Sequence, residues 1–473
     1  MTTECKQSSF EFHGLFQRKV IARFDGGNIT SDAGILLLRE VEKRTGIIAG
    51  LAECFNDHRD PEQIEHTVRE LLAQRIYGLC LGYEDLNDHD QLRADPMLAV
   101  AVEKADPLGE SRRQAADRGK ALAGKSTLNR LELTSAQVSR QERYKKIAMD
   151  GEKIDRWVVD VFIESQESAP EEIVLDLDAT DDPIHGNQEG RFFHGYYGNY
   201  CYLPLYIFSG EHLLCARLRR SNIDGADGAV DELKRIVGQI RQAWPEVKIV
   251  IRADSGFCRD PLLAWCEEEA NRIDYVIGLA KNVRLNKEIA EEMKSAEAQF
   301  RETGKSARVF KDFRYQTRDS WSCERRVVGK AEFMEKGANP RFVVTSLEPE
   351  RIDARALYED FYCARGDMEN RIKEQQLDMF ADRTSAATMR ANQLRLYLSS
   401  VAYMLMHALR RLGLKDTDLD RAQCQTIRLK LLKIGAQVRV TVRNIWISLA
   451  GGYPYVQVFA AVIRNLQALP LRC

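Results

Sequence analysis

Three acidic residues, far apart in the chain, are of a type and in a setting that could bind metal ions. Asp178 and Asp254 each end an apolar segment that predicts a β-strand, whereas Glu369 lies in a predicted helix. Magnesium prefers carboxylate oxygens and keeps several of its waters. Two such ions, about 4 Å apart, can activate an attacking oxygen and stabilise a leaving one. The three carboxylates therefore predict a two-metal site for phosphoryl transfer.

The first strand, residues 173–180, carries two candidate aspartates. Side chains alternate between the faces of a strand, so Asp176 and Asp178 share one face, opposite a face that is wholly apolar. Capping of the next turn is the alternative role, but Asp181 and Asp182 suit that role better. We expect at least one of the pair to be functional and prefer Asp178, with Asp176 left open.

Asp254 follows the second strand, residues 247–253, at its carboxyl end. Sites in open α/β sheets lie at the carboxyl ends of strands. The next helix already has its own start at Asp260-Pro261, with proline in the first helical position. Asp254 therefore has no evident structural role, and we expect it to be the second metal ligand.

The third carboxylate shares a helical face with cationic and aromatic residues. Tyr362, Arg365 and Glu369 are spaced i, i+3 and i+7; Lys373 continues this face, and Glu374 lies well round the helix. The Arg365 guanidinium would offer a fork to a phosphate, and Tyr362 could stack or hydrogen-bond beside it. Taken alone, this spacing is also that of an ordinary amphipathic helix with an arginine–glutamate pair.

Two physical consequences follow if these groups converge. Clustered carboxylates repel one another and raise one another's pKa unless cations neutralise them, so a metal requirement is expected. Gly366, inside the predicted helix, costs roughly 1 kcal/mol relative to alanine. That cost indicates that another backbone lies close to this glycine.

The elements predicted from residue 170 onward place both aspartates in one sheet. Three strands in succession precede alternating helices and strands, in the order β-β-β-α-β-α-β. This order implies an α/β fold with a mixed sheet covered by helices, and the ribonuclease H-like fold has it. The helix from 354 to about 376, which carries Glu369, comes only after a strand-rich segment at 281–348.

The N-terminal part is predicted to be mostly helical, and its last predicted helix is the charged segment 134–149. We therefore divide the chain into four parts. They are a helical DNA-binding and dimerisation region at 1–165, a ribonuclease H-like catalytic core at 170–280 and 350–385, a β-rich insertion at 281–348, and a basic, mainly helical region at 386–473.

Charge is unevenly distributed along the chain. Residues 383–473 hold 14 lysines and arginines against three aspartates, a net charge of +11, which leaves −13 on the remainder of a chain whose total is −2. A basic end on an acidic body suggests a polyanion partner, most often nucleic acid. A solvated helical surface is the alternative.

Composition indicates a soluble globular protein of the cytoplasm. The 473 residues are 44% hydrophobic and 30% charged, residues 1–10 lack the apolar stretch of a signal peptide, and the apolar segment 394–409 is too polar to span a membrane. The eleven cysteines contain no C-x-x-C pair, so we expect reduced thiols and no zinc site.

Three motifs are interpreted as having no catalytic function. Residues 119–126 match the phosphate-binding-loop pattern, but the charged segment before them cannot be the required buried strand, so no nucleotide cofactor is expected. The acidic cluster at 85–90 lacks the glycine and closing glutamate of a calcium loop. His185 and His194 lack a third ligand nearby, and their loop is interpreted as DNA-facing or as a hairpin.

Taken together, these motifs resemble the DDE transposases of bacterial insertion sequences. Tyr362-x-x-Arg365-x-x-x-Glu369 is similar to the Y-R-E signature of that family. Asp178-Ala-Thr180 and Ala253-Asp-Ser-Gly-Phe257 resemble its first two catalytic segments. The phrases GYEDLND at 82–88, LRADP at 92–96 and STLNRLE at 126–132 resemble the IS-thirteen-eighty group in particular.

The resemblance implies a catalytic role and metal ligation for Asp178, Asp254 and Glu369. It also implies a ribonuclease H-like core, a β insertion before the glutamate, and dependence on two Mg²⁺ ions, for which Mn²⁺ could substitute. The implied partners are terminal inverted repeats, target DNA and a second copy in a homodimer on paired ends. The implied location is the bacterial cytoplasm, at the nucleoid when DNA is bound, with no membrane partner.

One departure from the family concerns a lysine that often lies seven residues after the glutamate, where this chain has Gln376. Lys373 could reach the same phosphate from the Glu369 face. In the insertion, Arg314, Arg318 and Trp321 are expected to contact DNA near the cut, with the half-buried face of a β domain as the alternative. The rival functions are a metal-dependent nuclease of the same fold without strand transfer and a non-catalytic DNA-binding protein.

Overall fold

A computed structural model describes residues 9–472, which form two compact units. Unit 1 comprises the chain up to Met149, Asp378–Phe380 and the chain from Val401 onward. Unit 2 comprises Asp150–Leu377 and Ala381–Ser400. This division differs from the four predicted parts, because the N-terminal and C-terminal regions lie in one unit. Residues 1–8, which hold most of the segment examined for a signal peptide, lie outside the described range.

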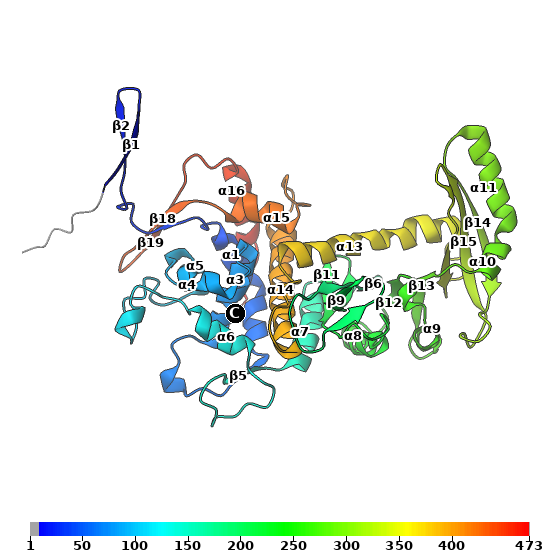
Figure 1. The fold of residues 1–473 in the computed structure, drawn as a ribbon, viewed down its shortest axis with the longest axis horizontal. Coiled ribbons are helices and arrows are strands. Elements are labelled where there is room, and N and C mark those ends of the chain that lie inside the picture. The colour runs from blue at the N-terminus through cyan, green and yellow to red at the C-terminus, as the bar shows by residue number, and fades with distance from the viewer. Residues whose placement is uncertain (1–8, 473) are drawn as a thin grey trace, which may run out of the picture. The chain divides into compact units, whose positions relative to one another are not determined.

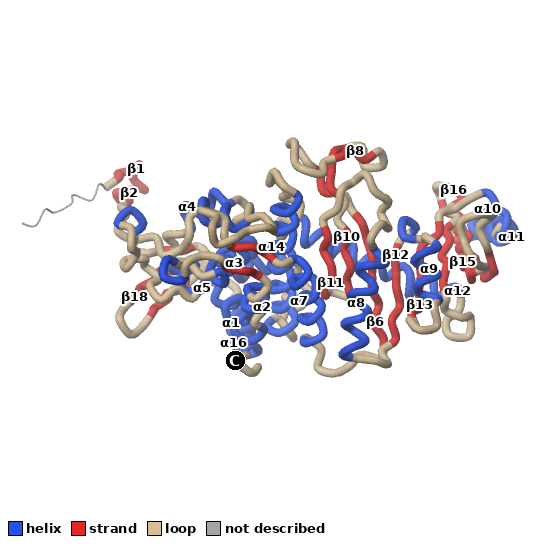
Figure 2. Tube along the Cα trace, turned by 90° about the horizontal axis from the view of Figure 1, so that it is seen from below, coloured by secondary structure: helices blue, strands red, loops and turns tan. Residues whose placement is uncertain are grey.

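Unit 2 is built on one nine-stranded mixed sheet, in the order β11-β10-β6-β12-β13-β17-β15-β14 with β16 beside β15. Its first five strands run side by side in Figure 2. They are β6 (Glu172–Ala179), β10 (Leu205–Ser209), β11 (His212–Arg217), β12 (Lys248–Ala253) and β13 (Ile273–Leu279). β10 is antiparallel to β6 and β11, whereas β12 is parallel to β6 and β13.

This order and these directions are those of a ribonuclease H-like core, which confirms the predicted fold class. Helices cover both faces of the sheet, with α8 and α9 on one side and the helix that ends in α13 on the other (Figure 1). The covering helices are α7 (Gly151–Glu164), α8 (Ala229–Ala243), α9 (Asp260–Glu267) and α13 (Gly366–Lys373).

The two faces of β6 explain why its aspartates face the α13 side. Ile173, Leu175 and Leu177 lie in the large apolar core beneath α7, α8 and α9. The alternate positions point to the other face, where Val174 packs against a smaller cluster that includes Leu357. Asp176 and Asp178 are on this second face. The predicted alternation therefore places both carboxylates toward the helix that carries Glu369.

The segment predicted as a separate insertion continues the same sheet. β17 (Arg341–Thr345) pairs antiparallel with β13, and β15 (Arg325–Met334) pairs with β17 and with β14 (Ala307–Tyr315). Within the predicted β-rich insertion, β14 and β15 therefore form a hairpin with a loop at 316–324. The remaining elements of this extension are α10 (Val283–Glu288), α11 (Ala290–Thr303) and β16 (Gly337–Ala338).

The Gly-rich segment after β6 is a hairpin, one of the two predicted alternatives. β8 (Phe192–His194) and β9 (Asn199–Tyr202) pair antiparallel, and β7 (Asp182–Pro183) joins β9 to form a three-stranded sheet. The second of the three successive strands predicted from the sequence, residues 201–208, is divided between β9 and β10, because Pro204 cannot donate to a ladder and separates them.

Unit 1 contains mostly helices, as predicted, and several strands, of which the sequence predicts only one, near residues 438–442. Its helices are α1 (Ile35–Thr45), α2 (Ile47–Ala52), α3 (Val68–Leu81), α4 (His89–Leu92), α5 (Pro96–Val102), α6 (Lys125–Glu132), α15 (Cys424–Ile427) and α16 (Val456–Gln467). Its strands are β1 (Phe10–Leu15), β2 (Arg18–Ala22), β3 (Ile29–Thr30), β4 (Phe55–Asp57), β5 (Ile147–Met149), β18 (Ala436–Val440) and β19 (Ile445–Leu449). α14 (Met389–Ala408) contributes residues to both units.

The predicted helix at 134–149 is wrong. Its residues form turns and end in the strand β5, which pairs with β4. The apolar side chains of this segment do not recur at three- and four-residue spacing, so a helix there would have no continuous stripe to bury.

Some basic residues of the C-terminal region have hydrogen-bond or ion-pair partners within unit 1. Arg428 is buried and donates to the carbonyl oxygens of Leu79 and Cys80 at 3.2 and 2.8 Å. Lys433 forms an ion pair of 2.7 Å with Asp32. These cations therefore stabilise the fold and are not presented to a polyanion.

Among the described residues, no helix is long and apolar enough to cross a membrane. The nine described cysteines are all free thiols, and six of them are buried.

A buried ion pair joins β6 and β12 and gives the first testable prediction. Arg252 donates to both carboxylate oxygens of Asp176, at 2.5 and 2.8 Å. Asp176→Ala would leave the guanidinium buried without its partner, so the free energy of unfolding should fall by about 3–5 kcal/mol.

Urea unfolding followed by tryptophan fluorescence measures this loss. Asp367→Ala removes an exposed carboxylate from α13 and should change stability by no more than about 0.5 kcal/mol. Equal, small losses in both variants would show that the Asp176 pair does not hold the sheet together.

Candidate active site

Asp178 and Asp254 lie at the carboxyl ends of the adjacent parallel strands β6 and β12, at the same edge of the sheet. The register between β6 and β12 pairs Leu177 with Ala253, so the residue after each pair is one of the two aspartates. The carboxyl ends of parallel strands are where α/β proteins place their sites. The structure therefore brings these two predicted residues together.

Asp254 has a structural role that the sequence did not reveal. Its backbone is extended, and its Oδ1 accepts a 2.9 Å hydrogen bond from the Gly256 amide at the start of a short helical turn, Ser255–Phe257. This corrects the expectation that the aspartate has none. The bond also fixes the carboxylate at the strand end, which suits a ligand that must be held in place.

The helix carrying Glu369 is continuous but irregular. A π-helical turn at Leu357–Tyr362 and a 3-10 turn at Cys363–Arg365 precede α13, and a second π-helical turn, Glu374–Asp378, follows it. π-Helical turns inside helices are frequent at functional sites. Here the first turn brings the Phe361 carbonyl oxygen within 2.5 Å of Arg252 Nη1 on β12.

Arg365 lies between carboxylates from a strand and from its own helix. Its Nη2 donates to Glu369 Oε1 at 2.7 Å, and its Nη1 lies 3.7 Å from Asp178 Oδ2. The Nη1 atom is buried and has no hydrogen-bond partner among the described residues. The guanidinium therefore bridges two of the three predicted ligands and still has hydrogen-bonding capacity.

Asp178 is the most perturbed of these carboxyl groups. Burial raises the pKa of Asp178 to about 6, and the neighbouring charges of Asp254 and Glu369 also raise it, whereas Arg365 and the Ala179 amide lower it. Burial and like charges disfavour the ionised form, and a bound cation would favour it. The electrostatics of the site therefore suit a positive ion beside Asp178.

Asp176 differs from Asp178 in its contacts. Both of its oxygens accept hydrogen bonds from Arg252, and its side chain is buried. A carboxylate engaged in this way is poorly placed to bind an ion. Glu374 is similarly engaged, because it is buried and pairs with Arg371 at 2.6 Å.

Tyr362 reaches the site through space that only a glycine leaves open. A Cβ atom at Gly278, on β13, would lie 2.6 Å from the Tyr362 hydroxyl oxygen and 2.9 Å from the Ser255 nitrogen. Burial raises the pKa of Tyr362, with Asp254 acting in the same direction and Arg365 opposing it. The close approach predicted at Gly366 is wrong, because a Cβ there would meet open space.

Two further residues line the site from directions that the sequence did not indicate. Tyr197, in the β8–β9 hairpin, donates to the Ala179 carbonyl oxygen at 3.2 Å. Burial, then Asp181 and Asp178, raise the pKa of Tyr197 to about 12. Gln376, which replaces the family lysine, donates to the Asp181 carbonyl oxygen at 3.3 Å. The comparison with the family lysine already draws attention to Gln376, whereas only its position in the folded chain reveals Tyr197.

The remaining predicted DNA contacts fall into two groups. Lys373, Arg314 and Arg318 are exposed, and Arg314 lies 3.3 Å from Glu348. Trp321 is only 6% exposed and packs edge-on against Tyr315 in the main core. The prediction that Trp321 contacts DNA is therefore corrected, because its indole completes the apolar core of the sheet extension.

The motifs interpreted as non-catalytic have structural roles. The segment directly before residues 119–126, residues 103–118, contains no strand, and Lys125 forms an ion pair of 3.3 Å with Asp90. Asp85 and Asp88 form a capping box around a single helical turn. His194 packs against Tyr197 in the hairpin.

Within residues 9–472 no three His, Cys, Asp or Glu side chains are arranged to hold a metal ion in this conformation. The chemistry of the donor set nevertheless fits one. Arg365 pairs with Asp178 and Glu369, and the charges of Asp254 and Glu369 act on Asp178, so the carboxylates are close enough to influence its pKa. Hard divalent ions select such oxygen donors.

Comparison with models of protein families identifies the family to which the chain belongs. The model of the family "Transposase DDE domain group 1" matches residues 12–471. The chain belongs to this family. It is therefore a DDE transposase, of a family of enzymes that act on DNA in transposition and recombination.

The transposase is also similar to a solved structure, described as the cryo-EM structure of the piggyBac transposase synaptic complex with hairpin DNA. The two are 12% identical, with a TM-score of 0.38, and the similarity covers 85% of this chain and 80% of the other. No curated protein sequence matches the chain.

Gly278 and Gly366 provide a matched pair of substitutions. Gly278→Ala should displace the Tyr362 hydroxyl or the Asp254 backbone and cost about 1–3 kcal/mol. Gly366→Ala has space for its methyl group and should stabilise the helix by about 0.5–1 kcal/mol. Thermal unfolding of both variants measures the contrast, and a stable Gly278→Ala protein would contradict the close approach.

The raised pKa of Asp178 predicts a pH-dependent stability in EDTA. The folded protein holds this proton more tightly than the unfolded chain, so the stabilisation is complete below pH ~4 and is lost as pH rises through about 6. Relative to Asp178→Asn, the wild type should lose up to about 3 kcal/mol over this range.

Denaturant unfolding at several pH values measures this difference. Asp319→Asn, which changes an exposed aspartate in the loop after β14, serves as the control and should run parallel to the wild type. A constant difference between the wild type and Asp178→Asn would rule out the shifted carboxyl group.

Proposed function

We propose that this transposase cuts DNA at the terminal inverted repeats of its insertion sequence and joins the ends to target DNA. Asp178, Asp254 and Glu369 would be the catalytic metal ligands in this proposal. The observation that carries it is that Arg365 pairs with Asp178 of β6 and Glu369 of α13, while Asp254, directly after β12, lies close enough to act on Asp178. The three acids come from different parts of the chain, and the charges of Asp254 and Glu369 raise the pKa of Asp178.

The ligands would hold two Mg²⁺ ions, with Mn²⁺ as a substitute. Such ions, when bound, supply the positive charge that polarises attacking and leaving oxygens in phosphoryl transfer. The sheet edge contributes rigidity, because Asp254 is held by the Gly256 amide and Asp178 lies within a strand. Asp176 is assigned to structure, since Arg252 occupies both of its oxygens.

Arg365 has two functions in this proposal. In the conformation described here its guanidinium offsets the charge of Asp178 and Glu369. Its Nη1, which lacks a hydrogen-bond partner among the described residues, can donate to a phosphate oxygen at the cut. Tyr362 would limit the space beside that phosphate, since its hydroxyl is held against Gly278.

Lys373 would supply the phosphate contact that Gln376 cannot make, because it is exposed on the helix of Glu369. Arg314 and Arg318 would contact DNA farther along the sheet extension. A homodimer on paired ends, membership of the IS-thirteen-eighty group and a bacterial location at the nucleoid complete the proposal. They rest on the motifs of the sequence.

Cleavage and strand joining of DNA that carries the element's own terminal repeats test the proposal. Wild type with Mg²⁺ should cut the repeat and join it to target DNA. Asp178→Asn, Asp254→Asn and Glu369→Gln should each lose roughly a thousandfold or more of the cleavage rate while still binding the repeat. Lys373→Ala should lose cleavage to a smaller extent.

Asp367→Asn, an exposed acid on the same helix, is the matched control and should cleave normally. Normal cleavage by Asp254→Asn would overturn the assigned site. Cleavage without joining under all conditions would instead favour the rival function, a metal-dependent nuclease.

A further inference from the structure

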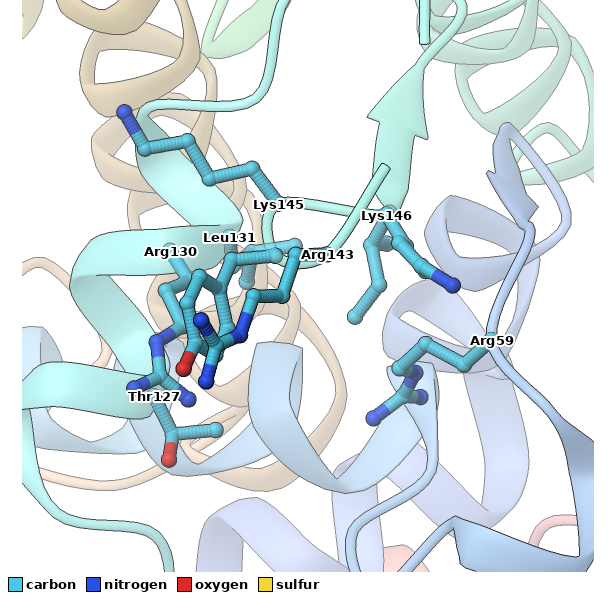
Figure 3. A pocket seen from close by; sticks show the side chains of 9 residues that line it. Arg59, Thr127, Arg130, Leu131, Arg143, Lys145 and Lys146 are labelled. Carbon is cyan, nitrogen blue, oxygen red and sulfur yellow. The ribbon is translucent and has the colours of Figure 1, made fainter. Parts of the chain in front are cut away.

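A small basic pocket lies in unit 1, which lacks the three catalytic carboxylates. It has a volume of about 170 Å³, and Figure 3 shows its side chains. No acidic residue lines it. The lining residues are Arg59, Thr127, Arg130, Leu131, Arg143, Tyr144, Lys145, Lys146 and Ile147.

Two structural elements form the pocket. α6 provides one wall, and its buried residues Leu128 and Leu131 fix the helix so that Arg130 remains exposed. The segment before β5 provides the other wall. It is fixed by the pairing of β5 with β4 and by a 2.9 Å hydrogen bond from the His58 amide to the Lys146 carbonyl oxygen. The wall is therefore positioned by backbone pairing.

Two guanidinium groups contact one aromatic ring in this pocket. The Arg130 and Arg143 carbons Cζ lie 4.6 and 5.1 Å from the centre of the Tyr144 ring, which is half exposed. Figure 3 shows Arg130 and Arg143 side by side in the pocket. Cation–π contacts orient the guanidinium groups without using their N–H donors. The donors therefore remain available to a ligand.

Two other cations of the pocket, Arg59 and Lys146, are already engaged by hydrogen bonds. Arg59 donates to Asp57 and to the His66 carbonyl oxygen, and Lys146 donates to the Arg140 carbonyl oxygen. Arg130 and Arg143, in contrast, form no ion pair with any described residue. Two like charges held together in this way repel each other, and a bound anion would relieve the repulsion.

The size and chemistry of the pocket indicate the kind of ligand. Its volume is below the roughly 300 Å³ at which sites for whole small-molecule ligands begin. A phosphodiester group of a longer polymer needs less space, and the exposed arginines around it can follow the adjoining backbone. Guanidinium forks match phosphate oxygens, and an aromatic ring can lie against a sugar or base.

We propose that the Arg130–Tyr144–Arg143 cluster binds the sugar–phosphate backbone of duplex DNA, independently of its sequence. This inference rests on the proposed function, because it assumes DNA as the partner. The pocket carries no carboxylate, so its contribution is to anchor DNA rather than to cut it. Its residues do not belong to the family motifs at the catalytic site.

Salt-dependent binding of full-length protein to a duplex of arbitrary sequence tests the proposal. Arg130→Gln/Arg143→Gln should weaken binding about three- to tenfold at ~0.1 M salt and reduce the slope of log K against log [salt] by roughly 1–2. Fluorescence anisotropy over a salt series measures both quantities.

Arg113→Gln/Arg118→Gln is the matched control. It removes the same charge from exposed arginines of unit 1 that do not line the pocket, and it should leave the slope unchanged. Thermal unfolding checks that both double variants fold. A third variant, Tyr144→Leu, removes the ring that orients the two guanidinium groups and should weaken DNA binding without a change in net charge. Equal slopes for the wild type and both doubles would overturn the proposal.

Two outcomes separate this inference from its alternatives. If the pocket served free phosphate, millimolar inorganic phosphate would raise the thermal midpoint of the wild type but not of the Arg130→Gln/Arg143→Gln variant. The salt dependence of DNA binding would be unchanged, and the proposal would fail.

Asp254→Asn should keep the wild-type salt dependence of DNA binding while losing cleavage. If the wild type cleaves its repeats but the pocket double binds normally, the inference fails and the proposed function stands.

Discussion

The site depends on the hydrogen bonds that the buried guanidinium group of Arg252 donates. It donates to both oxygens of Asp176 on the neighbouring strand and to the carbonyl oxygen of Phe361 on the covering helix. One side chain thus joins two strands and a helix. The Arg252 guanidinium donates three hydrogen bonds, so a shift of the helix along the sheet would leave part of this buried charge without a partner. Arg365 and Glu369 are held above Asp178 and Asp254 as a result.

Electrostatics then determine what this arrangement can bind. Burial and two neighbouring acids favour the neutral form of Asp178, and Arg365 only partly offsets them. Carboxylates brought together at such a cost are characteristic of sites that bind cations. The irregular helix turns contribute as well, since the π-helical turn at Leu357–Tyr362 presents the carbonyl that Arg252 binds.

Much of the fold and part of the site could be predicted from the sequence. The apolar face of β6 and the alternation of strands and helices are local patterns, so they predicted the mixed sheet. The role of Asp176 could not be predicted, because its partner Arg252 is 76 residues away. The same holds for Trp321, whose aromatic and basic neighbours suggest DNA contact until the sheet extension is seen to bury it. Tyr197 and Gly278 depend on three-dimensional proximity alone.

We propose that Asp178, Asp254 and Glu369 together form a divalent-ion site. Fe²⁺ in place of Mg²⁺, with ascorbate and peroxide, generates radicals that cut the polypeptide beside the bound ion, and mass spectrometry locates the cuts. We expect cuts near all three residues, suppressed by excess Mg²⁺ and absent in Asp254→Asn. Cuts confined to other segments, or unaffected by Mg²⁺, would contradict it.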